Sequence, residues 1–195
     1  MWKKIALALG AILVILVAVI AMQPSAFTVE RSAAIEAPAE IVFGHIQNLR
    51  AMDAWMPWAK IDPQMKTLYE GPEAGVGARS SWEGPEMGKG RIRITAVKPD
   101  HEVEMKLEML APMQATNRVL FSLGSTAEGT DVTWRMEGSN GFVGKAFSLF
   151  TDMDAMVGGE FAKGLASLKA LAEAEAARRK AESLRPTAHE DTPSR

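Results

Sequence analysis

The chain begins with a long apolar run, whereas the rest of it mixes apolar and charged positions. Residues 5–22 contain no charged side chain and directly follow Lys3 and Lys4. An apolar run of about 18 residues or more can cross the hydrocarbon core of a bilayer, so we expect a single-pass membrane helix. The two preceding lysines predict a cytoplasmic N-terminus and a domain on the outer, periplasmic or extracellular side. A cleaved secretion signal, with a weak cleavage site at residues 19–21, is the alternative.

Between residues 27 and 137, apolar and polar residues alternate in short stretches separated by turns. Every second residue is apolar in residues 102–110, and residues 130–137 repeat the pattern with valine, tryptophan and methionine. A strand with this pattern has one face on a core and the other in water. Glycine and proline residues mark the turns between stretches. Together they predict seven antiparallel strands at residues 27–35, 65–70, 77–83, 89–97, 102–110, 115–123 and 130–137.

Other segments repeat apolar residues with helical spacing. One begins at Pro38, a favourable residue for a first helical turn, and continues with a stripe over residues 41–49. A short helical segment is expected at residues 142–150. Residues 153–172 then carry apolar residues every three or four positions, which predicts one long amphipathic helix. Residues 51–63 contain two tryptophans and two prolines and are expected to form an irregular loop.

Composition narrows the possible functions. The net charge of the 195-residue chain is −2, whereas nucleic-acid binding would call for a basic face, so we expect no nucleic-acid partner. The absence of cysteine excludes disulfides, thiolate metal sites and cysteine nucleophiles. The three histidines, His45, His101 and His189, lack the spacing of a metal site. We therefore expect no metal, no cofactor and no catalytic constellation.

Three segments differ in composition. Residues 1–26 are expected to form the membrane anchor and a linker, and residues 27–172 to form a single domain. Residues 173–195 begin as an Ala/Glu/Arg-rich helix extension that reaches about residue 182. From about residue 183 the chain is polar, contains proline and lacks apolar periodicity, which is typical of a disordered tail.

Several stretches of the domain resemble the START-like, SRPBCC superfamily. These are residues 32–43 with their Glu36-Ala37-Pro38 step, the loop Trp55-Met56-Pro57-Trp58, the hairpin residues 75–84, and the helix residues 164–169. The resemblance covers residues 27–172 and is closest to membrane-anchored bacterial members described as polyketide cyclase/dehydrase-like. It implies an α+β helix-grip fold, in which a seven-stranded curved antiparallel sheet surrounds a long C-terminal helix. The superfamily includes lipid carriers, hormone receptors, cyclases, quinone-binding proteins and chaperone activators, so the fold does not select an activity.

A curved sheet closed by one helix leaves a cavity, and strand alternation predicts which side chains face it. The expected lining is apolar and aromatic with a few polar groups, as in small-molecule sites. Asn117 is the most informative of these polar groups, because a buried amide needs a hydrogen-bond partner. Trp55 and Trp58 lie in the loop and are expected either as a lid or membrane contact, or as a plug at one end. The predicted ligand-binding residues are Trp55, Trp58, Tyr69, Trp82, Met105, Asn117, Phe121, Trp134, Met153, Val157 and Phe161; simple core packing is the alternative for each.

Three functions remain open at this point. The favoured one is a non-catalytic, membrane-tethered binding or carrier protein for a hydrophobic small molecule or lipid. A polyketide cyclase/dehydrase-like enzyme would instead need a positioned acid and base, that is, two cavity-facing ionisable groups within reach of each other. The polar candidates for this role are His45, Glu83, Asn117, Asp152, Asp154 and Glu160. A module that modulates an unknown envelope partner would have a small or filled cavity and an apolar patch on the outer face of the sheet.

Overall fold

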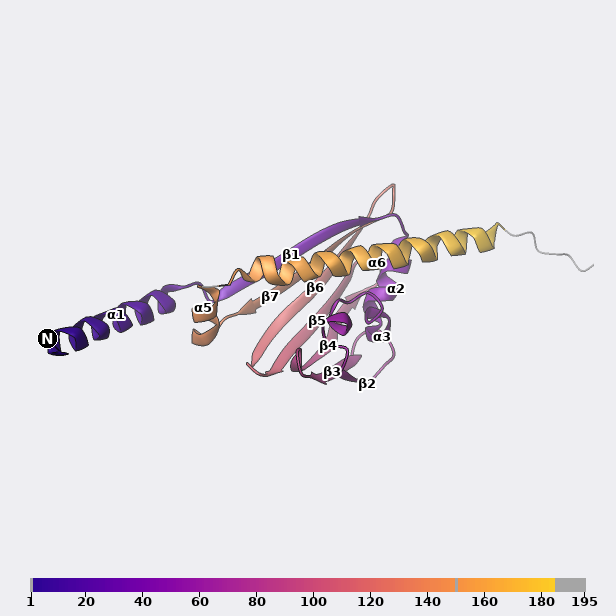
Figure 1. The fold of residues 1–195 in the computed structure, drawn as a ribbon. Coiled ribbons are helices and arrows are strands. Elements are labelled where there is room, and N and C mark those ends of the chain that lie inside the picture. The colour runs from indigo at the N-terminus through magenta and orange to yellow at the C-terminus, as the bar shows by residue number, and fades with distance from the viewer. Residues whose placement is uncertain (1, 150, 185–195) are drawn as a thin grey trace, which may run out of the picture.

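A computed structural model describes residues 2–149 and 151–184 of the chain. A projecting N-terminal helix leads into a curved antiparallel sheet, and a long C-terminal helix lies across that sheet (Figure 1). This arrangement confirms the predicted helix-grip fold. The disordered tail predicted from about residue 183 falls almost wholly on residues 185–195, which lie outside the described residues.

The sheet has seven strands in the order β1-β7-β6-β5-β4-β3-β2. Every neighbouring pair is antiparallel, and consecutive strands pair from β2 to β7, while β1 closes against β7. A register shift between Ile94 and Ala96 marks a bulge in β4, and bulges increase the local twist and bend of a strand. The strands are β1 (Ala26–Ile35), β2 (Lys66–Glu70), β3 (Arg79–Gly84), β4 (Gly88–Lys98), β5 (Glu102–Ala111), β6 (Ala115–Ser125) and β7 (Thr130–Ser139).

Two short helices replace part of the expected irregular loop at residues 51–63. The Asn48 side chain accepts hydrogen bonds from the backbone of Arg50 and Ala51 and so begins α3. Pro57 precedes the single turn of α4, where its fixed φ suits a helix start. The helices of the domain are α2 (Ala39–Gln47), α3 (Leu49–Met52), α4 (Trp58–Ile61), α5 (Phe142–Ser148) and α6 (Met153–Ser183).

The long helix α6 runs beside β1 and covers the concave face of the sheet (Figure 1). Its residues Phe161, Leu165 and Leu168 are buried, as the helical stripe predicts. At the start of α6, the Arg31 guanidinium of β1 pairs with Asp154 at 2.9 Å. Gly158 lies so close to Arg31 that an added Cβ would collide with the guanidinium, so this glycine permits a close contact between α6 and β1.

The core lies where α2 and the middle of α6 pack on the sheet. Strands β6 and β7 bury alternate residues, so that Val119, Phe121, Val132 and Trp134 all face this core. The α2 stripe adds buried apolar side chains from the other direction. The sheet's opposite face is charged, in agreement with the alternation in the sequence.

Helix α1 (Trp2–Met22) extends away from the domain (Figure 1) and is long and apolar enough to cross a membrane. Of its residues, Ile20 alone is buried. A secretion signal near the N-terminus has the same length and composition. A helix whose apolar side chains are exposed on all sides requires an apolar environment, whichever of the two roles it has.

Candidate functional site

An apolar cavity of about 260 Å³ lies between the concave face of the sheet, α6 and the segment that carries α3 and α4. Six methionines line it together with four aromatic residues. Methionine side chains are flexible and polarisable, which suits a site that adapts to apolar ligands. The lining residues are Leu49, Met52, Asp53, Met56, Trp58, Met65, Thr67, Ser80, Trp82, Met87, Ile92, Leu107, Met109, Asn117, Val119, Trp134, Met136, Val157 and Phe161.

The cavity opens to the surface between the β3–β4 hairpin, the end of β5 and the loop that joins α4 to β2. Met65, Met87 and Met109 line it there and are only half-buried. Deeper in, Met136 and Phe161 are buried, with 6% and 2% of their surface exposed. The cavity therefore has an open end and a closed end, and side chains that can change rotamer line the open end.

Three buried polar atoms of the cavity wall have no hydrogen-bond partner within the described part of the chain. They are Asn117 Oδ1, Trp82 Nε1 and Trp134 Nε1. Asn117 lies opposite Gly138 in the β6–β7 ladder, where an added Cβ would collide with Oδ1. Leaving a buried donor or acceptor unpaired costs about 1–3 kcal/mol. The residues of the wall thus carry two N–H donors and one amide oxygen that no described protein group satisfies.

Aromatic stacking fixes the closed end of the cavity. The Trp134 ring stacks on Phe161, with centroids 3.8 Å apart and an interplanar angle of 9°. Trp55 meets Trp134 edge to face, and its Nε1 donates a hydrogen bond of 3.2 Å to the His45 carbonyl oxygen. Trp55 is 2% exposed, so this tryptophan is a plug in the core and neither a lid nor a membrane contact.

The predicted ligand-binding residues divide between the cavity wall and the core. Those in the wall are Trp58, Trp82, Asn117, Trp134, Val157 and Phe161. Trp55, Met105 and Phe121 also face inward, but they lie in the core rather than in the wall. The reason is that α2 packs over β5 and β6 at that end of the sheet and fills the space. The side chain of Met153 lies outside the described residues.

Tyr69 also lies outside the cavity wall, because its side chain contacts Asp53 and Arg50 instead. The hydroxyl donates a hydrogen bond to Asp53, and the Arg50 guanidinium lies 4.3 Å from the ring centroid. Burial and then the hydrogen bond to the Asp53 carboxylate raise the pKa of Tyr69 well above its usual range. Tyr69 instead holds Asp53, which is the ionisable residue among those that line the cavity.

Sequence reasoning missed the methionines that lie in loops and turns. Met56 and Met87 line the cavity although they belong to no strand or helix stripe. Met65, which was expected to begin a strand, also lines it but lies in the loop before β2. Alternation and helical periodicity do not assign a direction to a loop side chain. The only signal in the sequence was the high number of methionines, which is 12.

Of the six polar candidates for acid and base, Asn117 lines the cavity, and its amide is not ionisable, whereas the other five lie outside the wall. His45 Nε2 lies 2.9 Å from a Glu175 carboxylate oxygen, between α2 and α6. Asp152 caps α6 by accepting a hydrogen bond from the Ala155 backbone, and Asp154 binds Arg31 as described above. The other two candidates form surface pairs, Glu83 with Lys89 at 2.8 Å and Glu160 with Lys163 at 2.7 Å. Within residues 2–149 and 151–184, no group of three His, Asp or Glu side chains could hold a metal ion.

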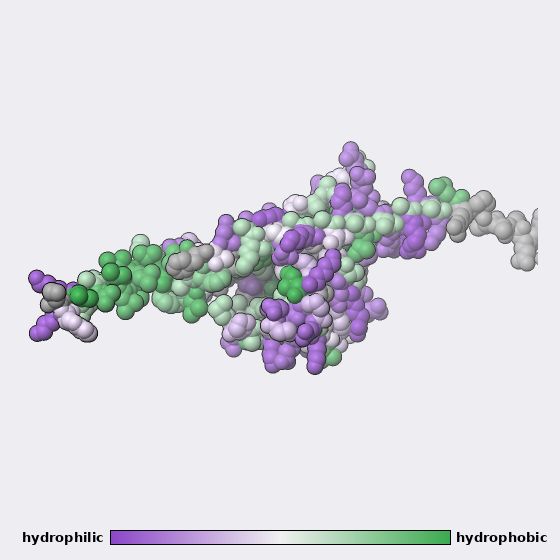
Figure 2. All heavy atoms as spheres, in the orientation of Figure 1, coloured by the Kyte–Doolittle hydropathy of each residue, from purple (hydrophilic) through white to green (hydrophobic). Residues whose placement is uncertain are grey.

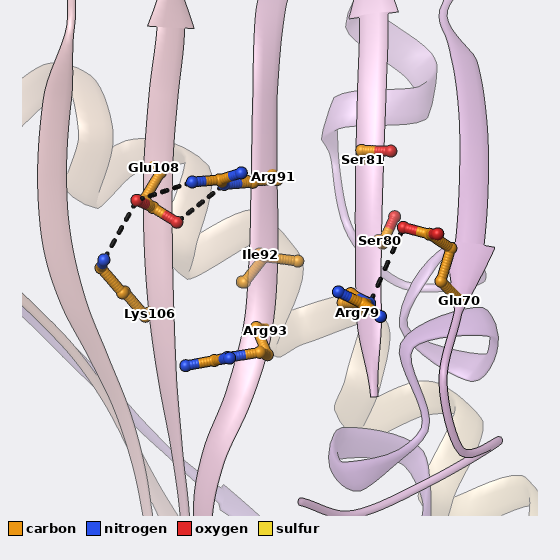
Figure 3. Close-up of a pocket in the computed structure, with 9 residues that line it drawn as sticks. All are labelled: Glu70, Arg79, Ser80, Ser81, Arg91, Ile92, Arg93, Lys106 and Glu108. Atoms are coloured by element: carbon orange, nitrogen blue, oxygen red, sulfur yellow. Dashed lines mark hydrogen bonds and ion pairs between the residues drawn. The ribbon is translucent and has the colours of Figure 1, made fainter. Parts of the chain in front are cut away.

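A second hollow, of about 270 Å³, lies on the outer face of β2 to β5 and is charged (Figure 3). Glu108 accepts hydrogen bonds from Arg91 and Lys106, which lower its pKa to about 2. Arg93 points into the same hollow beside these pairs (Figure 3). Small-molecule sites are mostly apolar with a few polar groups, so the cavity under α6 is the better candidate site.

Residues 26–173 match the protein family described as polyketide cyclase / dehydrase and lipid transport. The chain belongs to this family. That description joins catalysis and lipid transport, so membership alone does not distinguish a cyclase from a carrier. No curated protein matches the sequence.

Solved structures share the fold at low sequence identity. A protein from Chromobacterium violaceum is 17% identical with a TM-score of 0.56, and the match covers 75% of this chain and 96% of that one. The Aha1 protein of Colwellia psychrerythraea, solved as a dimer, is 18% identical with a TM-score of 0.54 over 75% and 96% of the two chains. The di-domain ARO/CYC protein StfQ of the steffimycin biosynthetic pathway is 11% identical with a TM-score of 0.57 over 78% and 52%. At these identities the likeness establishes the fold alone.

Proposed function

We propose that this protein binds a small hydrophobic molecule in the cavity under α6 and is held at a membrane by α1, without catalysing a reaction. The observation that carries the proposal is the cavity wall, which combines six methionines with three unpartnered polar atoms. An apolar wall with a few convergent polar groups is typical of small-molecule sites. Binding and presentation of a lipid or a similar molecule also agree with the lipid-transport part of the family description.

The size of the cavity restricts the ligand. Its volume of about 260 Å³ is just below the range of about 300–1,000 Å³ for small-molecule pockets. A ligand that buries about 200 Å² of apolar surface would gain roughly 5 kcal/mol at about 25 cal/mol per Å². Each hydrogen bond to an unpaired wall atom adds about 1 kcal/mol. The best ligand is therefore a compact apolar molecule, or one lipid tail end, that carries a carbonyl or hydroxyl group.

The three unpartnered polar atoms of the wall indicate where the carbonyl or hydroxyl group of the ligand would bind. Trp82 and Trp134 each present an indole N–H, which can only donate, and Asn117 presents an amide oxygen. A carbonyl oxygen would accept from an indole, whereas a hydroxyl could donate to Asn117 and accept from an indole at the same time. A pure hydrocarbon would leave all three atoms unpaired and would bind less tightly.

The cavity wall supports binding more than catalysis. General acid–base chemistry needs a donor and an acceptor placed on either side of the reacting atoms. Asp53 is the ionisable residue of the wall, and Tyr69 already occupies its carboxylate. The charged outer face of the sheet also gives little support to the interaction-module alternative, which calls for an apolar patch there.

Native mass spectrometry of the full-length protein, purified from membranes in mild detergent, tests this proposal. We expect a bound non-protein species that solvent extraction identifies as apolar with one or two oxygens. Val157→Phe would fill the cavity, because Val157 is in its wall, and should abolish the adduct. Met156→Phe is the matched control, since Met156 lies next to Val157 on α6 but is 50% exposed. The absence of any adduct, or equal adducts in both variants, would contradict binding in this cavity.

A further inference from the structure

The short helix α5 exposes an apolar face next to the end of α1. Phe142, Val143 and Phe147 are 52%, 64% and 47% exposed. At 100° per residue these three positions fall within one side of the helix. A folded domain rarely presents large contiguous side chains to water without a partner, so the face requires an occupant.

The structure fixes α5 against the membrane-facing end of the chain. Lys145 Nζ donates a hydrogen bond of 3.2 Å to the Ala21 carbonyl oxygen, and the Asn140 backbone donates one of 2.7 Å to Ser25. Ile20 is the buried residue of α1, and helices α1 and α5 are in contact. Figure 2 shows that the apolar surface of α1 continues onto the adjoining end of the domain.

The length of α1 determines the level of α5 relative to the bilayer. At about 1.5 Å per residue, the apolar run of residues 5–22 spans roughly 27 Å, close to the hydrocarbon thickness of about 30 Å. Residues 20–22 then lie at the edge of the hydrocarbon core. A helix packed against them lies at the level of the lipid headgroups, where amphipathic helices bury an apolar face by about 5–10 Å.

We infer that the apolar face of α5, formed by Phe142, Val143 and Phe147, inserts into the interface of the bilayer that α1 spans. The occupant of this face is thus a lipid surface, and α5 is a second contact that holds the domain down on the membrane. This inference rests on the membrane tether of the proposed function and not on ligand binding. Lys145, on the same helix, keeps its ammonium at the level of the α1 terminus, as interfacial lysines do.

Insertion of α5 into the membrane interface would also bring the start of α6 close to the lipid. The segment after α5 leads into α6, whose first two turns carry the cavity residue Val157 and the exposed Met156. With α5 in the interface, this end of the cavity wall lies close to the lipid.

The absence of cysteine makes a direct test possible. Single cysteines at Val143 and Phe147 would carry nitroxide spin labels in the full-length protein, reconstituted in phosphatidylcholine–phosphatidylglycerol vesicles. Val14→Cys in α1 is the membrane reference. Ser125→Cys, exposed at the end of β6 remote from α5, is the water reference. Accessibility to oxygen, which concentrates in lipid, and to a water-soluble nickel chelate reports the position of each label.

We expect the labels at positions 143 and 147 to show a several-fold higher ratio of oxygen to nickel accessibility than the label at 125. A ratio equal to that at 125 would overturn the inference while leaving the tether intact, provided that the label at 14 lies in lipid. Shielding from both reagents would mean that protein, such as a second copy of the chain, covers α5. A label at 14 in water would overturn both the tether and the inference, whereas ligand binding is decided separately by mass spectrometry.

Discussion

The indole ring of Trp134 on β7 lies flat against the phenyl ring of Phe161 on α6, with centroids 3.8 Å apart. Both residues are buried and both line the cavity. The stack therefore joins β7 to α6 at the boundary between the packed core and the cavity. Its loss should affect both the stability of the domain and the shape of the site.

Replacing Phe161 with alanine should destabilise the domain by about 3–5 kcal/mol, the usual cost of deleting a buried aromatic side chain. The thermal midpoint of the full-length protein in detergent, followed by near-ultraviolet circular dichroism, measures this loss. Met156→Ala removes a half-exposed side chain from the same helix and should change the midpoint little. Equal midpoints for the two variants would show that the stack does not hold α6 to the sheet.

Two glycines of α6 should respond to alanine in opposite directions. A Cβ at Gly164 would lie 2.9 Å from the Trp134 ring and 3.5 Å from Pro57, whereas a Cβ at Gly159 would meet nothing within 4 Å. Overpacking at Gly164→Ala should cost about 1–3 kcal/mol. Gly159→Ala should stabilise the helix by up to about 1 kcal/mol. The thermal midpoints of the two variants, compared with that of the unaltered protein, test this prediction. A stabilised Gly164→Ala protein would contradict the close packing of α6 on Trp134.

The fold could be predicted from the sequence because its elements have strong local signals. Alternation located all seven strands to within about two residues, and the stripe of α6 was continuous. The two short helices α3 and α4 were missed, because each has four residues and no apolar period to detect. Their formation depends on a cap from Asn48 and on Pro57, which are single-residue signals inside a loop rich in tryptophan and proline.

The candidate site could be predicted only in part, because alternation gives the direction of a side chain and not what it meets. Phe121 and Asn117 point to the same face of β6, but α2 covers Phe121 and leaves Asn117 beside the hollow. The packing of one element over another is a tertiary property that a strand pattern does not encode. The same holds for Trp55, which packs edge to face on Phe121 and Trp134 and donates its indole N–H to the His45 carbonyl oxygen.

Acid should weaken the outer face of the sheet through Glu108. Hydrogen bonds from Arg91 and then Lys106 lower the pKa of its carboxyl from 4.5 to about 2 in the folded protein. The unfolded chain therefore binds the proton first as the pH falls. The contribution of this carboxylate to stability is complete above about pH 4.5 and is lost as the pH drops towards 2. Glu108→Gln should flatten the dependence of the thermal midpoint on pH over this window, while Glu128→Gln, in the β6–β7 hairpin, should leave it unchanged.

Arg93 lies in the middle of a row of cations across the outer face. It is directly opposite Arg79 on β3 and Lys106 on β5, and it forms no ion pair within residues 2–149 and 151–184. Like charges in this position destabilise a sheet. Arg93→Thr should therefore stabilise the domain by about 0.2–1 kcal/mol at low salt. The gain should shrink in about 1 M salt, where the Debye length is only about 3 Å.

The matched control for Arg93 is Arg91→Thr on the same strand. Arg91 binds Glu108 at 2.8 Å, so its removal should leave stability unchanged or lower it. Thermal midpoints at two salt concentrations compare the variants. A gain at Arg91 as large as that at Arg93 would mean that total charge, and not the cross-strand row, determines the effect.

Asn117→Leu should separate ligand binding from folding. The amide oxygen of Asn117 is buried without a partner among the described residues, so an apolar side chain of similar size removes an unpaired group and should keep or raise stability. A bound molecule whose hydroxyl donates to this oxygen would lose that hydrogen bond and bind roughly 5-fold to 10-fold more weakly, for about 1 kcal/mol. Retention of the co-purified molecule, quantified by native mass spectrometry, gives the answer. Gln47→Leu, which removes an amide outside the cavity wall, should retain the ligand fully. Equal retention by both variants would remove Asn117 from the site and leave the two indoles as its polar contacts.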